Sequence, residues 1–382
     1  MMNPALPKEK GRVREMFKLN VTVRRKGRVK VKNILAKAVS GERISSEDSI
    51  ELFNKADIYQ IGEAADKIRQ KLYPEKHVTF IIDRNINYTN ICVNQCRFCA
   101  FWREEDNPEG YLLSKTEILK KVEEAVDNGA TKIMLQGGLH PDINIEYYLN
   151  AFKAIKDKFN VVLHSLSAPE IVHLSKRSGL ILEDTISLLK SAGLDSLPGA
   201  GAEILAKETR KRISEKKINA DEWFLVMETA HRLGLYSTAT MMFGVGEKIE
   251  ERIEHMERVR KLQDRTGKFR GFIPWTFQPG HTKIGGSEVP AEDYLKTLAI
   301  ARIYLDNVSH IQGSWLTQGE EIGQISLFFG ADDLGSIMLE ENVVRSTGVS
   351  RKMNTDKIVR LIQKAGFIPV QRDTEYKTIK EF

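Results

Sequence analysis

The fold of this chain is constrained most by a regular alternation of short apolar runs with amphipathic segments, from residue 78 to about residue 340. The runs have the length of buried strands, and the segments between them carry apolar residues at helical spacing. This pattern is typical of βαβ units and a parallel sheet. Strands are predicted at Val78–Ile82, Lys132–Gln136, Val161–Ser167, Leu194–Leu197, Tyr236–Phe243, Gly271–Phe277, Val308–Trp315 and Leu334–Met338.

Seven or eight such units favour an α/β fold, a closed (β/α)8 barrel of the TIM type, with a doubly wound open sheet as the alternative. A barrel takes about 250 residues, and the chain has 382. We expect the barrel at residues 77–340, preceded by a helical layer at 33–76 and followed by a packed segment at 341–382. In that last segment the sequence predicts one helix, Thr355–Ala365, and one strand, Phe367–Val370. No long linker interrupts the barrel region, so we expect no second catalytic domain.

The first 32 residues form a basic arm with eleven Lys or Arg and two Glu, although the whole chain has a net charge of only +6. Such an arm is able to contact nucleic acid or an anionic surface. Because no aromatic interleaving or binding module accompanies the charges, we favour a solvated extension and expect no nucleic-acid partner. No apolar run is long enough to span a membrane, so we expect no membrane span.

All three cysteines of the chain lie in one short loop with the spacing C-x3-C-x2-C, at Cys92, Cys96 and Cys99. Three thiolates suit a [4Fe–4S] cluster, and with no fourth cysteine one iron stays open for a small molecule. A structural zinc site is the alternative, but it needs a fourth ligand. The nearest histidines, His77 and His140, are not placed as such a ligand pair.

With Phe98 before its last cysteine, the loop resembles the signature of radical S-adenosylmethionine (SAM) enzymes. The flanking runs Asn85–Asn90 and Ala100–Phe101 are similar to those of the futalosine-pathway and deazaflavin-forming subgroup. The resemblance implies that the open iron binds SAM, that Phe98 contacts the cofactor, and that one electron yields a 5′-deoxyadenosyl radical. It further implies an electron donor such as flavodoxin or ferredoxin. Cysteine usage agrees with a reducing, cytoplasmic location.

Two glycine-containing runs follow predicted strands, where a barrel gathers its chemistry. Gly137 and Gly138 let the backbone approach a ligand closely, and the resemblance implies that they hold the amino group of SAM. The acidic residue of the family's Gly-Gly-Glu-Pro-like motif is absent here, and a simple β-turn is the alternative. Glu203 follows Gly199–Ala202, and the resemblance implies contact with SAM; the alternative is a solvated carboxylate at a helix start.

Three residues near strand ends, His164, Glu170 and Asp195, are candidates for a catalytic base. The sequence does not choose among them. In the run Trp275–Gln278, the first and third residues share one face of a strand and the other two share the opposite face. Either pair is able to line a pocket.

Several runs extend the resemblance over residues 40 to 370, toward the members of the subgroup that cyclise dehypoxanthine futalosine in menaquinone biosynthesis. The runs are Gly137–Pro141, Asp195–Glu203, Thr238–Gly244, Ile273–Gly280 and Gly330–Gly335. The implied reaction, of a radical-SAM oxidoreductase, removes hydrogen from the ribose C4′, joins that carbon to the benzoate ring, and releases a proton and an electron. An aminofutalosine synthase, a deazaflavin-forming enzyme and a non-enzymatic iron–sulfur carrier are the alternatives.

Overall fold

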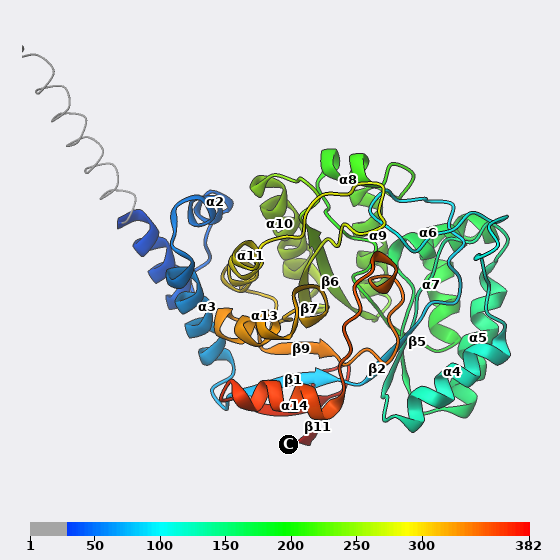
Figure 1. Ribbon diagram of the computed structural model, residues 1–382. Helices are drawn as coiled ribbons and strands as arrows, with labels where there is room; N and C mark the ends of the chain where they lie inside the picture. The colour runs from blue at the N-terminus through cyan, green and yellow to red at the C-terminus, as the bar shows by residue number, and fades with distance from the viewer. Residues whose placement is uncertain (1–28) are drawn as a thin grey trace, which may run out of the picture.

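A curled parallel sheet is the centre of the computed structural model, which describes residues 29–382 (Figure 1). Its seven strands follow one another in the order β2-β3-β4-β5-β6-β7-β8. Their bounds are Asp83–Ile86 for β2, Lys132–Leu135 for β3, Val162–His164 for β4, Leu194–Leu197 for β5, Tyr236–Phe243 for β6, Phe269–Thr276 for β7 and His310–Ile311 for β8. Every neighbouring pair is parallel, as the alternation of strands and helices predicts.

The strand β9 (Asp333–Ser336) fills an eighth position beside β8 and corresponds to the predicted strand Leu334–Met338. It is joined to β8 by one bridge, between Gln312 and Asp333, and it pairs on its other side with β1 (His77–Ile81). Because β1 continues almost directly into β2, the strands form a ring. The backbone N–H of Leu339 donates to the carbonyl of Asp83 at 3.1 Å across this junction. The predicted TIM-type α/β fold is therefore confirmed.

The first predicted strand, Val78–Ile82, is not hydrogen-bonded into the seven-stranded sheet where we expected it. It is β1 and belongs to a four-stranded sheet of order β11-β10-β1-β9, whereas β2 leads into the cysteine loop. The sequence signal for β2 is weak because Asp83 and Asn85 are polar and face the interior of the ring. An apolar pattern identifies strands whose faces pack in a core, and this strand lines a polar interior.

The C-terminal strands close one end of the barrel. Strand β10 (Ile368–Arg372) runs parallel to β1, and β11 (Thr378–Glu381) returns antiparallel to β10. The turn between them carries Tyr376, whose ring stacks on His310 with the centroids 3.5 Å apart. Arg270, near the start of β7, donates to the carbonyl of Thr374 at 2.9 Å. The turn at 373–377 is therefore packed against the end of the barrel where the strands begin.

Helices cover the outside of the ring, and their starts follow the capping signals in the sequence. Ser114 and Glu117 form a capping box at the start of α4, and Ser45 forms one with Asp48 at the start of α2. The helices after β1 are α4 Lys115–Asp127, α5 Ile145–Lys158, α6 Ala168–Ser178, α7 Leu182–Ser191, α8 Lys207–Ile213, α9 Ala220–Arg232, α10 Ile249–Thr266, α11 Ala291–Tyr304, α12 Trp315–Gln318, α13 Glu320–Ile325 and α14 Thr355–Lys364; two short 3-10 helices lie at Ser326–Phe329 and Arg345–Thr347. None of the helices in residues 29–382 is long and apolar enough to cross a membrane.

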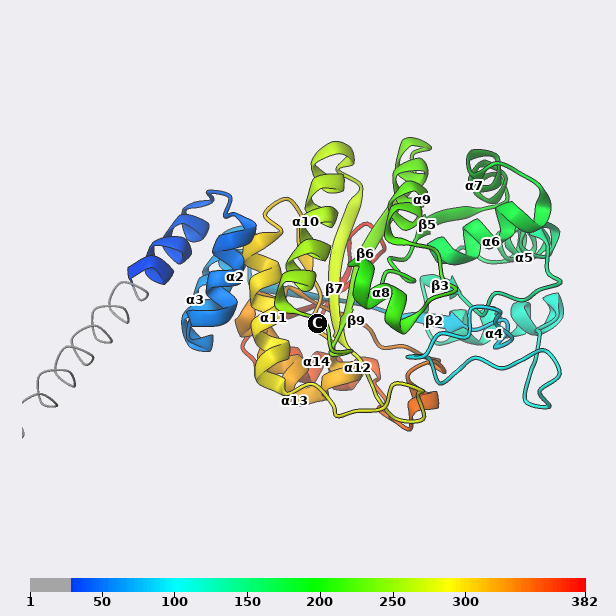
Figure 2. The ribbon, with the colours of Figure 1, turned by 90° about the horizontal axis from the view of Figure 1, so that it is seen from above.

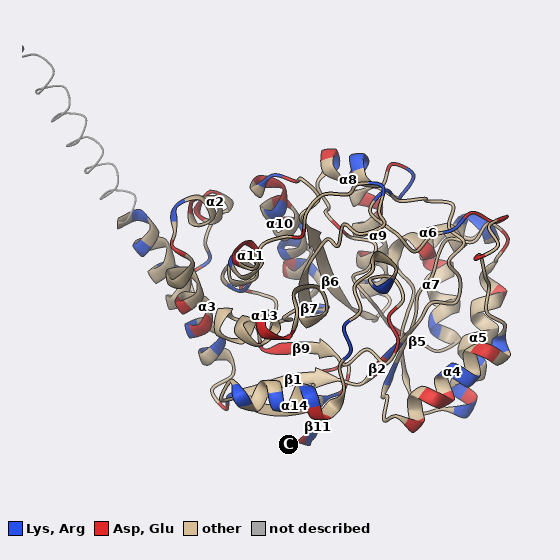
Figure 3. Cartoon of the chain, in the orientation of Figure 1, with Lys and Arg blue, Asp and Glu red and all other residues tan. Residues whose placement is uncertain are grey.

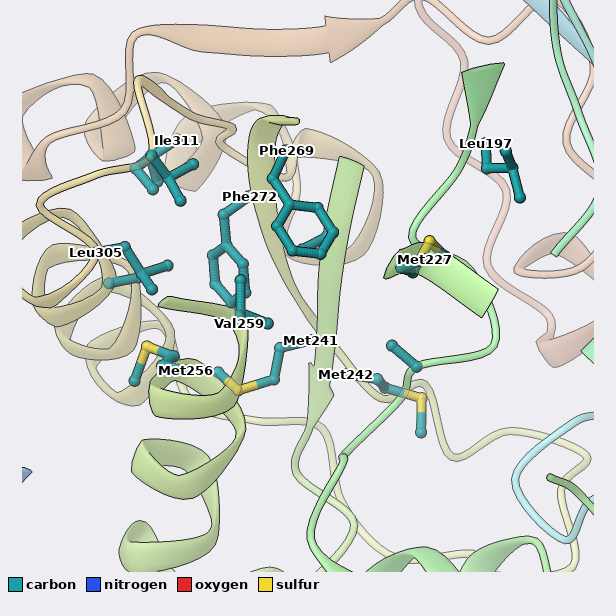
Figure 4. Packing of buried hydrophobic residues seen from close by; sticks show 14 of the residues in the cluster. Leu197, Met227, Met241, Met242, Met256, Val259, Phe269, Phe272, Leu305 and Ile311 are labelled. Atoms are coloured by element: carbon teal, nitrogen blue, oxygen red, sulfur yellow. The ribbon is translucent and has the colours of Figure 1, made fainter. Parts of the chain in front are cut away.

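The core between the sheet and its helices is continuous and apolar. Figure 4 shows Met241 and Phe272, from β6 and β7, beside Met256 and Val259 of α10. All four side chains are fully buried. Burying a side chain of this size contributes about 1.5–3 kcal/mol, so this layer holds the strand ends in fixed positions.

The helices before β1 lie against α10 and α11 (Figure 2). Residues 29–40 are helical, and α2 (Ser46–Lys55) and α3 (Ile58–Leu72) follow. Arg43 donates to Asp264 at 2.7 Å and to Asp306 at 2.9 Å, which fastens this layer to the barrel. The division of the chain at residues 32, 76 and 340 stays a prediction. Most of the basic arm, residues 1–28, lies outside the described residues.

Candidate active site

The cysteine loop follows β2 and is fastened to the barrel by backbone hydrogen bonds. The N–H of Val93 donates to the carbonyl of Leu139 at 3.0 Å, and that of Arg97 donates to Ile213 at 2.9 Å. Gly138 lies directly beneath the loop, where a Cβ would overlap the carbonyl oxygen of Ile91. The cysteine loop is therefore able to pack on the end of β3 only because residue 138 is a glycine. A simple β-turn would not require a glycine for this reason.

The three motif cysteines are free thiols, and they differ in exposure. Cys96 is buried, whereas Cys92 and Cys99 are partly buried. Burial raises the pKa of Cys96 to about 12 and also raises that of Cys99. Within residues 29–382, no three His, Cys, Asp or Glu side chains are grouped as ligands of one ion. In an iron–sulfur cluster each cysteine binds a different iron, so a common ion is not needed.

A buried ion pair lies beside the cysteine loop. Lys217 Nζ is 2.6 Å from Glu203 Oε1 and 5.2 Å from the centre of the Phe98 ring. Burial lowers the pKa of Lys217, but the charges of Glu203 and Cys96 outweigh it and hold that pKa above its usual value. Glu203 is 7% exposed and precedes the start of α8 by four residues, so it is not a solvated carboxylate at a helix start.

The second oxygen of Glu203 is buried and has no hydrogen-bond partner among residues 29–382. The same is true of Asn85 Oδ1, and both residues line the central cavity. A buried polar atom left without a partner costs about 1–3 kcal/mol. Two such atoms facing one cavity indicate a polar ligand that supplies the missing donors.

The central cavity has a volume of about 310 Å³ and lies inside the ring of strands. Phe98 and Glu203 line it near the cysteine loop, at the carboxyl ends of the strands. Lys132, Arg270 and Arg372 line it at the other end, beside the turn that carries Tyr376. Asp83 pairs with Lys132, Asp333 with Arg372, and Glu375 with Arg270 at 3.1 Å, so this end holds three cations and three carboxylates. We call these six charged residues the cavity floor.

His164 lies in the cavity wall. Its Nδ1 is 2.8 Å from Ser196 Oγ, and its Nε2 makes no hydrogen bond within the described part of the chain. Burial, followed by the charges of Lys132, Arg270 and Arg372, holds the pKa of His164 well below its usual value. The ring is therefore neutral at pH 7, with a nitrogen able to accept a proton.

The structure does not bring Glu170 or Asp195 to the cavity. Glu170 is buried behind the wall, where it caps α6 and accepts hydrogen bonds from Tyr88 at 2.6 Å and from the Gly137 N–H at 3.1 Å. Burial raises its pKa. Asp195 points away from the interior and accepts from Lys156 at 2.6 Å. Its neighbour Ser196 faces inward, as the alternation along a strand requires.

Trp275 is the residue of the run Trp275–Gln278 that lines the cavity, together with Ile273 two positions earlier. Strand β7 ends at Thr276, so the alternation that pairs Trp275 with Phe277 stops before Phe277. Phe277 is buried in the apolar core instead. Lys217 is a site residue that the sequence did not suggest, because it lies in a polar loop without a recognisable motif.

The residues present fit an iron–sulfur cluster and SAM. Three thiols on one loop are suitable iron ligands. The unpartnered oxygen of Glu203 is able to accept from hydroxyl or ammonium groups. The absence of a Cβ at Gly137 and Gly138 lets Tyr88 and the cysteine loop pack closely on this strand end.

Two family models match the chain. The first is the radical SAM superfamily, over residues 86–259. The second is the CofH/MqnC C-terminal region, over residues 266–381. Together they cover the strands from β3 to β11.

Several named proteins are similar over almost their whole length. The cyclic dehypoxanthine futalosine synthase of Halalkalibacterium halodurans is 46% identical, over 92% of this chain and 96% of its own. That of Streptomyces coelicolor is 48% identical, over 90% and 88%. The aminodeoxyfutalosine synthase of Thermus thermophilus is 37% identical, over 91% and 95%. Among solved structures, methylornithine synthase (PylB) matches with a TM-score of 0.69 and 18% identity, over 88% of this chain and 97% of that one, which shows a shared fold.

Proposed function

The chain belongs to the radical SAM superfamily, in the group that contains the cyclic dehypoxanthine futalosine synthases, and on that premise we propose that it cyclises dehypoxanthine futalosine in menaquinone biosynthesis. The observation that carries this proposal is the identity to two such synthases over nine-tenths of the chain. The aminodeoxyfutalosine synthase is less similar, and so are the 4-hydroxyphenyl transferases that resemble the chain. Aminofutalosine synthesis and deazaflavin formation are therefore less supported.

Enzymes of this superfamily hold a [4Fe–4S] cluster and SAM, which when bound supply a 5′-deoxyadenosyl radical able to take a hydrogen atom from a ribose carbon. Cys92, Cys96 and Cys99 would hold the cluster. Glu203 would accept hydrogen bonds from SAM through the oxygen that has no hydrogen-bond partner among residues 29–382. The other residues proposed to contact SAM are Phe98, Gly137 and Gly138.

The cavity would orient the substrate and keep water away from it. Trp275 and Ile273 give one wall an apolar surface, and the turn that carries Tyr376 closes the far end. Each cation of the cavity floor is paired with a carboxylate. Their ammonium and guanidinium groups are still the cationic donors that line the cavity, and we propose that the benzoate carboxylate of the substrate lies toward Lys132, Arg270 and Arg372.

His164 is the residue we propose as the base that restores the aromatic ring. It is neutral, and a hydrogen bond from Nδ1 to Ser196 would leave Nε2 as the acceptor facing the cavity. A positioned base typically contributes 10²–10⁴-fold to a rate. Glu170 and Asp195 have no comparable access.

We also propose a protein electron donor, such as flavodoxin or ferredoxin, and a cytoplasmic location. Both are inferred from the reaction and from three cysteines that form no disulfide. The cluster must be supplied with an electron before each new radical is made, unless the last step of the reaction returns one.

The test is anaerobic reconstitution with iron and sulfide, followed by turnover of dehypoxanthine futalosine deuterated at the ribose C4′. We expect deuterium in 5′-deoxyadenosine and a product lighter than its substrate by the two hydrogens removed, one as an atom and one as a proton. Substrate deuterated only at another ribose carbon is the matched control and should give unlabelled 5′-deoxyadenosine. A product that contains the adenosyl group would instead assign aminofutalosine synthesis.

A further inference from the structure

A wide groove lies on the outer side of the cysteine loop, separate from the central cavity. Its volume is about 840 Å³, and it is lined by loop residues, by the segment 206–216 that contains α8, and by the start of α10. We call it the basic groove. Gln95 and Arg97 line the basic groove, whereas Phe98 lines the central cavity. The cysteine loop is therefore the wall between the two spaces.

Seven of the residues that line the basic groove are Lys or Arg, and four are Glu. Several of these cations contact neutral groups. Arg212 donates to the carbonyl of Val245 at 2.8 Å, Lys216 donates to Gln95 at 2.7 Å, and Lys283 lies 4.5 Å from the centre of the Trp102 ring. Neutral partners do not cancel charge, so the groove carries an excess of three positive charges.

This excess contrasts with the rest of the folded chain. Residues 33–382 sum to a net charge of −3, because the whole chain is +6 and the first 32 residues supply +9. Lys207 and Lys211 lie four positions apart on α8, are exposed, and so project from one face of that helix. Figure 3 shows the charged residues on α8 at the top of the molecule. A local positive field of this kind attracts an acidic partner and orients its approach.

We propose that the basic groove is the docking surface of an acidic protein that carries one electron. The inference rests on the proposed function, because only a cluster held by the cysteine loop needs this electron. One electron leaves the reduced cofactor of the donor and reduces the cluster, and no bond is made or broken. Docking here brings the donor to the loop that holds Cys96 without obstructing the cavity that would hold the substrate.

A complex formed at this groove would be transient. Electron-transfer partners bury small interfaces, below about 1,200 Å², and depend on charge for their encounter rate. Long lysine side chains are suited to such an interface because they stay hydrated and tolerate several orientations.

The test uses two charge reversals in one variant, Lys207→Glu with Lys211→Glu, which changes the local charge by −4. The matched control is Lys115→Glu with Lys120→Glu on α4, an exposed pair with the same change in net charge. The probe is a reduced flavodoxin of net negative charge. Binding to each protein is measured by calorimetry at low and high salt, and reduction of the reconstituted cluster is followed by its electron paramagnetic resonance signal.

We expect wild-type binding to weaken with salt, and the α8 variant to bind flavodoxin at least tenfold more weakly and to be reduced by it correspondingly more slowly. The α4 control should match the wild type, and all three proteins should be reduced equally fast by dithionite. Equal reduction of the α8 variant and the wild type by flavodoxin would overturn the proposal. Loss of DNA or anionic-vesicle binding in the α8 variant, with flavodoxin binding unchanged, would also overturn it. Cluster reduction needs no substrate, so this result is independent of whether dehypoxanthine futalosine is cyclised.

Discussion

Replacing Glu203 by glutamine tests whether the buried ion pair beside the cysteine loop serves SAM or only the fold. The amide has the same size as the carboxylate, and its oxygen is still able to accept a hydrogen bond from Lys217. What the substitution removes is the charge, both toward Lys217 and toward any donor that approaches the unpartnered oxygen.

Two magnitudes follow from this geometry. Breaking a buried pair completely costs about 3–5 kcal/mol, but a retained hydrogen bond limits the loss of unfolding free energy to about 1.5–3 kcal/mol. Unfolding entropy is about 2.1 cal/mol/K per residue, so for a chain of this length the melting temperature should fall by roughly 2–4 °C. A lost charge-assisted hydrogen bond to SAM has a similar cost, which corresponds to at least a roughly tenfold weaker affinity.

The assay combines thermal unfolding of the apo protein with calorimetric binding of SAM to the reconstituted protein. Glu247→Gln is the matched control, because Glu247 is also buried, pairs with Arg252 at 2.8 Å, and does not line the central cavity. The control should lose stability and keep its affinity for SAM. The reasoning is refuted if Glu203→Gln loses stability but binds SAM as tightly as the wild type.

Three other outcomes are expected. Changing Cys92, Cys96 or Cys99 to alanine should abolish both bound iron and 5′-deoxyadenosine formation, and a fully active protein that holds one tetrahedral zinc would contradict the cluster. His164→Gln should keep deuterium transfer from the ribose C4′ but slow product formation at least 100-fold, whereas Asp195→Asn, which alters a half-exposed pair, should leave turnover unchanged and cost at most about 1 kcal/mol of stability. Burial lowers the pKa of His231 to about 4 and that of His255 to about 3. Since the unfolded chain binds these protons from pH 6.5 downward, the unfolding free energy should fall by about 1.4 kcal/mol per pH unit for each histidine as the pH is lowered from 6.5 to 4. Urea unfolding over this pH range should show a weaker dependence of the unfolding free energy on pH for His231→Asn than for the wild type.

The sequence predicts those parts of the fold that are fixed by local chemistry. Capping residues such as Ser114 satisfy nearby backbone groups, so their position in the sequence is their position in the helix. Strand β6 has the predicted bounds, Tyr236–Phe243, because Gly234 and Gly244 bound a run with no Gly, Pro, Asn or Asp in it. The ring-shaped fold follows from the number of repeats, which is a property of the whole chain.

Other features depend on contacts between distant segments, and the sequence does not reveal them. Strand β5 has only four residues, too few for the sequence pattern to show whether Asp195 or Ser196 points into the barrel. Lys217 becomes a site residue only because the loop after α8 returns to Glu203. The polar strand β2 reads as a loop until the interior of the ring is known to be polar. In each case the deciding contact is made by residues far from the motif.

Closure of the ring has a consequence for the order of events during synthesis. Thr79 pairs with Asp333, 254 residues further along, and β1 then accepts β10 from the end of the chain. The cysteine loop therefore leaves the ribosome long before the strands that complete its surroundings, and contacts of such high sequence separation form slowly. Lys217 and Glu203 also emerge more than 100 residues after the loop. Insertion of iron and sulfide into a finished site is thus a step that follows translation, and a nascent chain stalled before residue 333 would expose its thiols to oxygen.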